Sequence, residues 1–344
     1  MHLRLDPWAA EYNTAYYAQE IFEEHDAKVQ TNIEHREWQA ISPKAIDLDY
    51  QNFFFVDGSR RIEARVLLEA EQQQLAFGAI ASYGIGAVCC CPRQQRQASY
   101  VFPERAFPEE QLQSITRVCS LGSGHALADF TIDNPITKQL GALNYHVESS
   151  PEVDPDAVIR KVQNMMLAAE RRLSVLLMQA HPQSLIVHDG PLPKGRESGF
   201  ENIVGYVKTI HSLKLGRSEL EVVRSLAQGQ RSPLYLVQEK EASLNHFEFF
   251  LRLRDPNPWL FSLAGMWRIQ IHAGQRVKEK LEAAQNLADY LSIQLPKFAS
   301  RQHQDPRAPQ QLLPIKALEA ELKRKMGHPQ VIRRRITQYI STLK

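Results

Sequence analysis

The chain has 344 residues, of which 43% are hydrophobic, and its 41 Lys and Arg against 39 Asp and Glu give a net charge of +2. A disordered chain has fewer apolar residues and a larger net charge, so this composition predicts a folded protein with a sizeable core. Three of the four cysteines are adjacent, at positions 89 to 91. Neighbouring side chains diverge too far for a disulfide framework or a spaced zinc site, so we expect a reducing, cytoplasmic location.

The first 50 residues carry acids where a signal peptide has its apolar core, so they indicate no secretion signal, and they predict a helical lead-in. Three segments follow that predict an antiparallel meander of strands: QNFFFVDGSRR, IEARVLLEA and LAFGAIASYGIGAVCCC. The last segment is uncharged, but it is shorter than the roughly 20 residues of a membrane-spanning helix. Gly78, Gly84 and Gly86 interrupt it, so it predicts a buried strand with glycine bends in a soluble protein without membrane contact.

The next part of the chain predicts helices and strands in alternation. The segment PEEQLQSITRVCSL predicts a helix, and a strong helix begins at the N-cap Asp154 and Pro155 and continues to about Ala180. After it the sequence predicts, in order, the strands SLIVHD and IVGYVKTI, the helix RSELEVVRSLAQ, the strands PLYLVQ, FEFFLRL and WRIQIH, a helix from about 275 to 291, and a final helix PIKALEAELKRKM.

This order predicts an α/β fold in which helices flank a mixed sheet. We expect three parts: a helical lead-in over 1–50, a core over 51–300, and a basic carboxyl-terminal extension over 301–344 that packs on the core. From Ser300 to Lys344 there are ten Lys and Arg against three acids, so this tail has a charge of +7 and the rest of the chain −5.

Two segments share a local pattern in which an apolar run leads to Asp-Gly. FFFVDGS contains Asp57 and Gly58, and SLIVHDG contains Asp189 and Gly190. We expect each aspartate at the point where a strand gives way to a glycine turn, which would hold the carboxylate on rigid backbone and let a ligand approach closely. Asp-Gly is also a common turn dipeptide, which suffices to explain either occurrence alone.

Glu170 is the candidate for a third carboxylate. It follows Met166 by four residues and precedes Leu173 by three, which puts it in the apolar stripe of its helix. A carboxylate there either reaches a solvated rim or has a partner that offsets its desolvation, such as a divalent cation, and both interpretations stay open. Three carboxylates suit Mg²⁺ or Mn²⁺, and two such ions can promote hydrolysis of a phosphodiester.

The segments FFFVDGSRR, AAERRL, LIVHDGPL and IVGYVKTI, in this order, resemble the NurA family of prokaryotic DNA nucleases over about residues 52–209. The resemblance implies an RNase H-like core and a Mn²⁺- or Mg²⁺-dependent active site with Asp57, Glu170 and Asp189 as metal ligands. It also implies 5′ to 3′ exonuclease and single-strand endonuclease activity, a homodimer, and a HerA-type hexameric helicase as partner in processing DNA ends.

Two departures from the family pattern stand out. Pro191 replaces the hydroxyl residue that usually follows the second Asp-Gly. The family has a later metal-site histidine, for which His303 is the best candidate, with Asp305 two residues further on. His272 competes for this role, although a lone histidine on a strand is more often structural.

Basic residues provide candidate DNA contacts. Lys208, at the end of GYVK, either contacts a phosphate or is an ordinary solvated lysine, and Tyr206 either orients a water or packs in the core. Further candidates for contacts with the DNA backbone are Arg60, Arg301, Arg307, Arg333 and Arg334. A basic helix is equally typical of a solvated face.

Two other functions remain open from the sequence. One is a non-catalytic subunit that clamps DNA or regulates a hexameric translocase, and the other is a phosphotransferase of actin-like fold, whose glycine-rich phosphate turns we do not find. The chain has no Walker motif, so extensive unwinding of DNA would require a separate ATPase.

Overall fold

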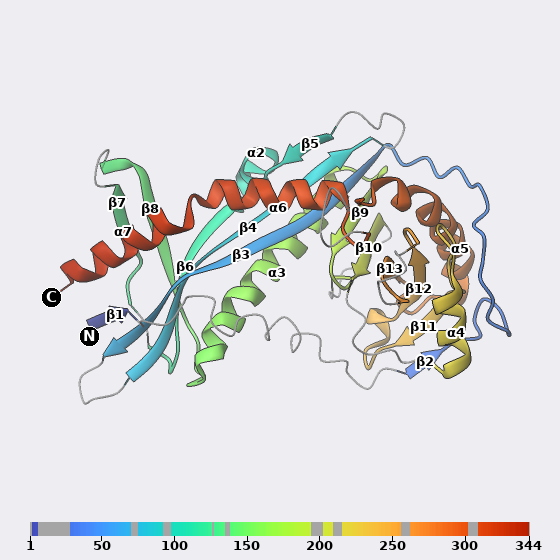
Figure 1. Cartoon of the computed structure of the whole chain (residues 1–344), viewed down its shortest axis with the longest axis horizontal. Helices are drawn as coiled ribbons and strands as arrows, with labels where there is room; N and C mark the ends of the chain where they lie inside the picture. The colour runs from blue at the N-terminus through green and yellow to red at the C-terminus, as the bar shows by residue number, and fades with distance from the viewer. Residues whose placement is uncertain are drawn as a thin grey trace.

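The computed structural model describes residues 2–5, 28–69, 75–91, 98–125, 127–134, 138–193, 202–208, 215–255, 262–301 and 309–343. These residues form an elongated α/β protein around one mixed sheet, with both chain ends at the same end of the molecule (Figure 1). The strands are β1 His2–Leu5, β2 Lys28–Gln30, β3 Asn52–Glu69, β4 Leu75–Cys90, β5 Ala98–Val101, β6 Ile115–Leu121, β7 Phe130–Asn134, β8 Lys138–Ser149, β9 Ser184–Asp189, β10 Ile203–Val207, β11 Tyr235–Gln238, β12 His246–Arg252 and β13 Met266–His272. The α-helices are α2 Pro103–Ala106, α3 Pro155–Ala180, α4 Arg217–Ser225, α5 Val277–Gln294, α6 Leu313–Met326 and α7 Pro329–Thr342. The predicted α/β fold with a helix-flanked mixed sheet is therefore confirmed.

The strand order places β3 in the middle of the sheet. The path runs β2-β11-β12-β13-β10-β9-β3-β4-β6-β8-β7, with β1 beside β3 and β5 beside β4. Strand β4 is antiparallel to both of its neighbours, β3 and β6, whereas β9 is parallel to β3 and β10 is parallel to β9. Helix α3 connects the first group to the second, and it crosses behind β3 and β4 in the view of Figure 1.

The alternation of side chains along β3 supplies two separate cores. Phe53 and Phe55 are buried against α5 and α6 on one face of the sheet. Phe54 and Val56 are buried against α3 on the other face. Because successive side chains of a strand point to opposite faces, Asp57 lies on the same face as Phe53 and Phe55, which α6 covers.

Glycines in β4 let α6 lie close to the sheet. An added Cβ on Gly86 would lie 3.2 Å from a methyl carbon of Leu318, and one on Gly84 would lie 3.3 Å from a methyl carbon of Leu322. Strand β4 continues through both positions. The predicted buried strand is therefore confirmed, but these glycines make room for a helix and do not bend the chain.

Two local predictions are wrong, for reasons of pairing. The segments FFFVDGSRR and IEARVLLEA form the single 18-residue strand β3, so Asp57 lies within a strand and not at its end. In PEEQLQSITRVCSL only Pro108–Glu110 is helical, as a 3-10 turn, and Ile115–Leu121 forms β6. Pairing with β4 and β8 decides both cases, because it supplies backbone hydrogen bonds that local sequence does not reveal.

The lead-in also differs from its prediction. Residues 28–50 contain no helix, and their strand β2 pairs with β11, while residues 2–5 pair with β3. The part of the predicted helical lead-in that covers 6–27 lies outside the described residues. A second basic helix, α7, follows α6 and buries Ile332, Ile336 and Ile340.

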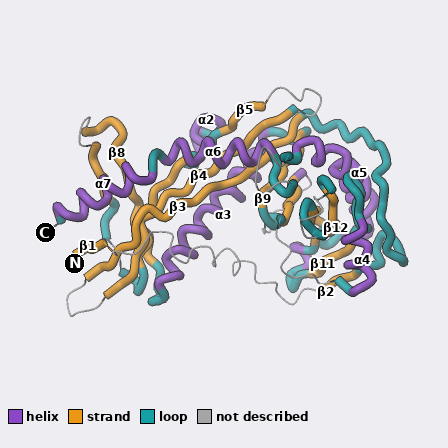
Figure 2. Tube along the Cα trace, viewed as in Figure 1, coloured by secondary structure: helices purple, strands orange, loops and turns teal. Residues whose placement is uncertain are grey.

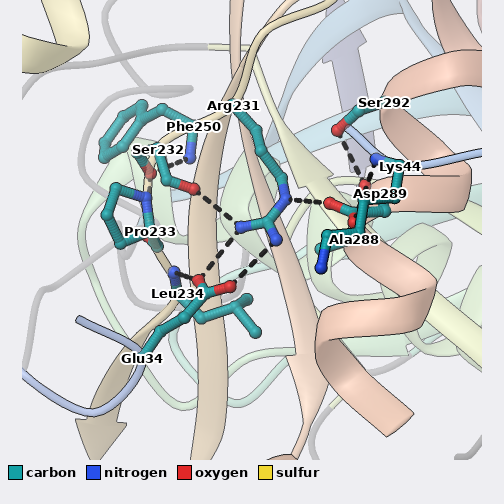
Figure 3. A network of polar contacts seen from close by, with 10 residues as sticks. All are labelled: Glu34, Lys44, Arg231, Ser232, Pro233, Leu234, Phe250, Ala288, Asp289 and Ser292. Atoms are coloured by element: carbon teal, nitrogen blue, oxygen red, sulfur yellow. Dashed lines mark hydrogen bonds and ion pairs between the residues drawn. The ribbon is translucent and has the colours of Figure 1, made fainter. Parts of the chain in front are cut away.

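A buried ion network fixes residues 28–50 to the core (Figure 3). The Arg231 guanidinium donates to both carboxylate oxygens of Glu34, at 2.9 and 3.0 Å, and to Asp289 of α5 at 2.6 Å. All three side chains are almost fully buried. The backbone N–H of Lys44 donates to Asp289 as well. The network therefore joins the lead-in, the segment before β11 and helix α5.

Candidate metal centre

Asp57 and Asp189 lie on adjacent strands. Val56 of β3 is opposite His188 of β9 in a parallel pairing, so the next residues of the two strands, Asp57 and Asp189, lie side by side. Asp189 is the last residue of β9, and Gly190 after it has φ of +114°, a conformation that favours glycine. The prediction of a strand end followed by a glycine turn is thus confirmed for the second Asp-Gly.

Helix α6 adds a third carboxylate that the sequence did not single out. Oxygens of Asp57, Asp189 and Glu319 all lie within 4.8 Å of one another, the one such group of three among the described residues. Leu318, the neighbour of Glu319, packs on Gly86, which is paired with Asp57. The close approach of α6 over the β4 glycines therefore brings Glu319 to Asp57. Gln311 donates to Glu319 Oε1 at 3.2 Å.

Asp57 is the most enclosed of the three carboxylates, with 8% of its surface exposed. Its Oδ1 accepts a hydrogen bond from the backbone N–H of Gly58, at 2.8 Å. Its Oδ2 is buried and has no hydrogen-bond partner among the described residues. Burial, and after it the charge of Asp189, holds the pKa of Asp57 well above its usual value. An enclosed carboxylate oxygen without a donor is suited to bind a cation.

Lys208 places one positive charge beside the carboxylates. Its Nζ lies 2.6 Å from Asp189 Oδ2 and 5.3 Å from the centre of the Tyr206 ring. Burial alone would lower the pKa of Lys208, but the carboxylates of Asp189 and Asp57 outweigh it and raise that pKa. A divalent cation carries the charge and accepts the oxygen ligands that would stabilise such a cluster of carboxylates in their ionised form.

The Tyr206 side chain forms the wall next to Asp189. It is fully buried, and its ring stacks on Trp267 with 4.0 Å between the ring centres. Its hydroxyl is buried and makes no hydrogen bond of good geometry with a described residue. Burial first, then the carboxylates of Asp189 and Asp57, keep its pKa well above the usual value. Tyr206 therefore remains a neutral hydrogen-bond donor facing the carboxylates.

Glu170 lies on the other face of the sheet. It is 2% exposed, and an ideal Cβ on Gly58 would be 2.0 Å from its Oε1. Burial, and after it Asp189, holds the pKa of Glu170 well above its usual value. The structure thus brings together Asp57 and Asp189 of the predicted ligands and puts Glu170 behind them, outside the group of three oxygens. A metal-ligand role for Glu170 stays a prediction.

The other candidate residues are spread over the molecule. His303, Asp305 and Arg307 lie outside the described residues. His272 lies on β13, where its Nε2 is 3.0 Å from the carbonyl oxygen of Ser243, and it does not belong to the carboxylate group.

The predicted DNA-contacting arginines do not share one surface. Arg60 lies two residues after Gly58 on β3 and therefore on the same face of the strand, the one that α3 covers. Arg333 and Arg334 are exposed on α7, which lies at the end of β3 away from β9 (Figure 2). Arg301 is exposed in the segment before α6. A role in DNA binding stays a prediction for each of them.

No protein-family model matches the chain, and no curated protein sequence is similar to it. No helix among the described residues is long and apolar enough to cross a bilayer.

The signal for Glu319 in the sequence was weak. It stands next to Leu318 in the helix PIKALEAELKRKM, where basic residues dominate. Only the contact of this helix with a strand more than 200 residues earlier distinguishes Glu319 from Glu321, which pairs with Arg324 at the surface.

Proposed function

We propose that the protein is a divalent-metal-dependent deoxyribonuclease. The observation that carries the proposal is the group of oxygens from Asp57, Asp189 and Glu319 within 4.8 Å of one another. All three ligands are carboxylates, the donors that Mg²⁺ and Mn²⁺ prefer, and the buried Asp57 Oδ2 has no hydrogen-bond partner within the described part of the chain. Such ions, when bound, activate a water and stabilise the leaving oxygen of a phosphodiester.

The strand order supports an RNase H-like core. The path β6-β4-β3-β9-β10 has three antiparallel strands followed by two parallel strands, with α3 in the connection. This is the arrangement that we expect from the resemblance to NurA nucleases. The carboxylates of Asp57 and Asp189 lie where β3 pairs with β9.

The neighbouring residues have complementary roles in this proposal. Lys208, already beside Asp189, would contact a phosphate oxygen of the DNA as a compact positive charge. The neutral hydroxyl of Tyr206 would donate a hydrogen bond toward the reacting groups. The wider proposal follows the same resemblance: 5′ to 3′ exonuclease and single-strand endonuclease activity in the cytoplasm, in a homodimer that acts with a HerA-type hexameric helicase.

Cleavage of end-labelled linear DNA and of circular single-stranded DNA tests the proposal. We expect cleavage with Mn²⁺ or Mg²⁺, none with EDTA, and a loss of at least 100-fold in Asp57→Asn, because the substitution removes a charged ligand. Asp133→Asn is the matched control, since Asp133 is an exposed residue of β7. Equal cleavage by wild type and Asp57→Asn, or none with any metal, would contradict the proposal.

A non-catalytic DNA clamp is the alternative. It is favoured by the Lys208 contact, which already balances one carboxylate without a metal. The clamp predicts DNA binding that is the same with Mn²⁺ and with EDTA, and no cleavage.

A further inference from the structure

The turn after Asp189 folds back on strand β10. The backbone N–H of Gly190 donates to the Tyr206 carbonyl oxygen at 3.0 Å. Two residues later the backbone of Leu192 passes directly over Gly205, because an added Cβ on Gly205 would lie 2.4 Å from the Leu192 nitrogen. The backbone next to the Asp189 carboxylate is therefore packed against β10, and only glycine permits this approach.

One side chain holds this turn from the next strand. Gln270 of β13 stands directly opposite Gly205 in the antiparallel pairing with β10. Its Oε1 accepts a hydrogen bond from the backbone N–H of Leu192 at 2.7 Å. Gln270 is buried, and so is the Leu192 side chain. Without this acceptor the Leu192 N–H would be a buried donor that has lost its hydrogen bond, which destabilises the turn.

Glu248 fixes the direction of the Gln270 amide. The Nε2 of Gln270 donates to Glu248 Oε1 at 2.6 Å, so its Oε1 has to face Leu192. Glu248 stands opposite Gln270 on β12, and Tyr235 stands opposite Glu248 on β11 and donates to Glu248 Oε2 at 2.6 Å. His246 Nε2 lies 3.2 Å from the same carboxylate. A row of buried polar residues thus crosses the sheet from β11 to the turn after Asp189.

We propose that Gln270 is a positioning residue for the candidate metal centre: through the Leu192 N–H it holds the turn that sets the direction of the Asp189 carboxylate. The proposal rests on the proposed function, because it assumes that Asp189 binds a divalent ion. Groups that hold a metal ligand in place typically change metal affinity 10- to 100-fold when they are removed.

Calorimetric titration of the metal-free protein with Mn²⁺ alone tests the role of Gln270. Gln270→Met keeps the length of the side chain and loses both hydrogen bonds. We expect it to weaken Mn²⁺ binding about 10-fold or more. Its far-ultraviolet circular dichroism spectrum should stay that of the wild type. The matched control is Gln230→Met. Gln230 Oε1 also accepts from a backbone N–H, that of Ala227, away from the carboxylates, so we expect wild-type affinity.

Hydrogen exchange of the peptide that contains Leu192 gives a second measurement, in wild-type protein. We expect slow exchange that Mn²⁺ slows further, and a smaller effect of Mn²⁺ in Gln270→Met. If Gln270→Met does not fold, the wild-type exchange alone decides. Wild-type affinity in folded Gln270→Met, or exchange at Leu192 that does not respond to Mn²⁺, would overturn the positioning role while the nuclease proposal stands. If the wild type binds no Mn²⁺, both proposals fail.

Discussion

The Glu170 carboxylate occupies the space that a side chain at residue 58 would fill, with 2.0 Å between its Oε1 and an ideal Cβ on Gly58. Gly58 follows Asp57 on β3 and faces α3, so its missing side chain lets the helix bring a carboxylate against the strand. The glycine of the first Asp-Gly therefore serves the packing of Glu170 and not a turn.

Gly58→Ala should destabilise the protein by about 1 to 3 kcal/mol, because the new methyl group displaces a buried carboxylate. Urea unfolding measures the change. In the background of Glu170→Ala, which frees the space, the same substitution should cost less than half as much. An equal cost in both backgrounds would show that the clash with Glu170 is not the cause.

Glu319→Gln should weaken Mn²⁺ binding about 10-fold or more, and more than Glu170→Gln does, because Glu319 shares the oxygen group with Asp57 and Asp189. Calorimetric titration of metal-free protein measures the affinity. Glu321→Gln is the control on the same helix, since Glu321 pairs with Arg324. A larger effect of Glu170→Gln would assign the third ligand to α3 instead of α6.

Lys208→Met should lower the unfolding free energy of the metal-free protein by about 1 to 3 kcal/mol. This cost is smaller than that of breaking a fully buried ion pair, because the side chains of Lys208 and Asp189 are both partly exposed. Asp189 then lacks the ammonium that lies beside it, so Mn²⁺ should raise the melting temperature more in this variant than in wild type. Lys161→Met, which removes a more exposed pair with Glu148, should cost at most about 1 kcal/mol. A smaller Mn²⁺ effect in Lys208→Met than in wild type would contradict the assignment.

The contribution of His188 to the stability of the metal-free protein should fall between about pH 6.5 and pH 4. Burial lowers the pKa of this side chain to about 4, and its Nδ1 lies 3.1 Å from the Ser174 hydroxyl. In this window the unfolded chain binds a proton that the folded protein does not, so stability is full above the unfolded pKa and is lost as pH falls, by about 3 kcal/mol at pH 4. Urea unfolding in EDTA should show a shallower pH dependence for His188→Gln. Parallel curves for variant and wild type would exclude His188 as the cause.

Arg231→Met should destabilise the protein by about 3 to 5 kcal/mol, because it leaves Glu34 and Asp289 buried without a positive partner (Figure 3). Guanidinium unfolding measures this, and Arg217→Met, in an exposed pair with Glu221, should change stability by less than about 0.5 kcal/mol. A loss of less than 1 kcal/mol in Arg231→Met would mean that the network contributes little.

Elements whose causes are local can be predicted from the amino-acid sequence. Helix α3 begins at Asp154, whose side chain accepts from the Asp156 N–H, and strand β9 ends at Asp189 before a glycine of positive φ. Caps, turn glycines and apolar periods depend on residues only a few positions apart, so they can be read from the chain. The place of Glu170 in the apolar stripe of α3 followed in the same way, whereas its burial did not, because a solvated rim was an equally open interpretation.

The group of three carboxylates depends on packing between segments that are far apart in the sequence. Asp57 lies within β3 because β4 and β9 pair with that strand on both sides. Glu319 reaches Asp57 because Gly84 and Gly86 let α6 approach the sheet, a contact between segments more than 200 residues apart. The face of the sheet on which a residue lies, and the helix that covers that face, depend on packing between distant segments, which no local pattern encodes.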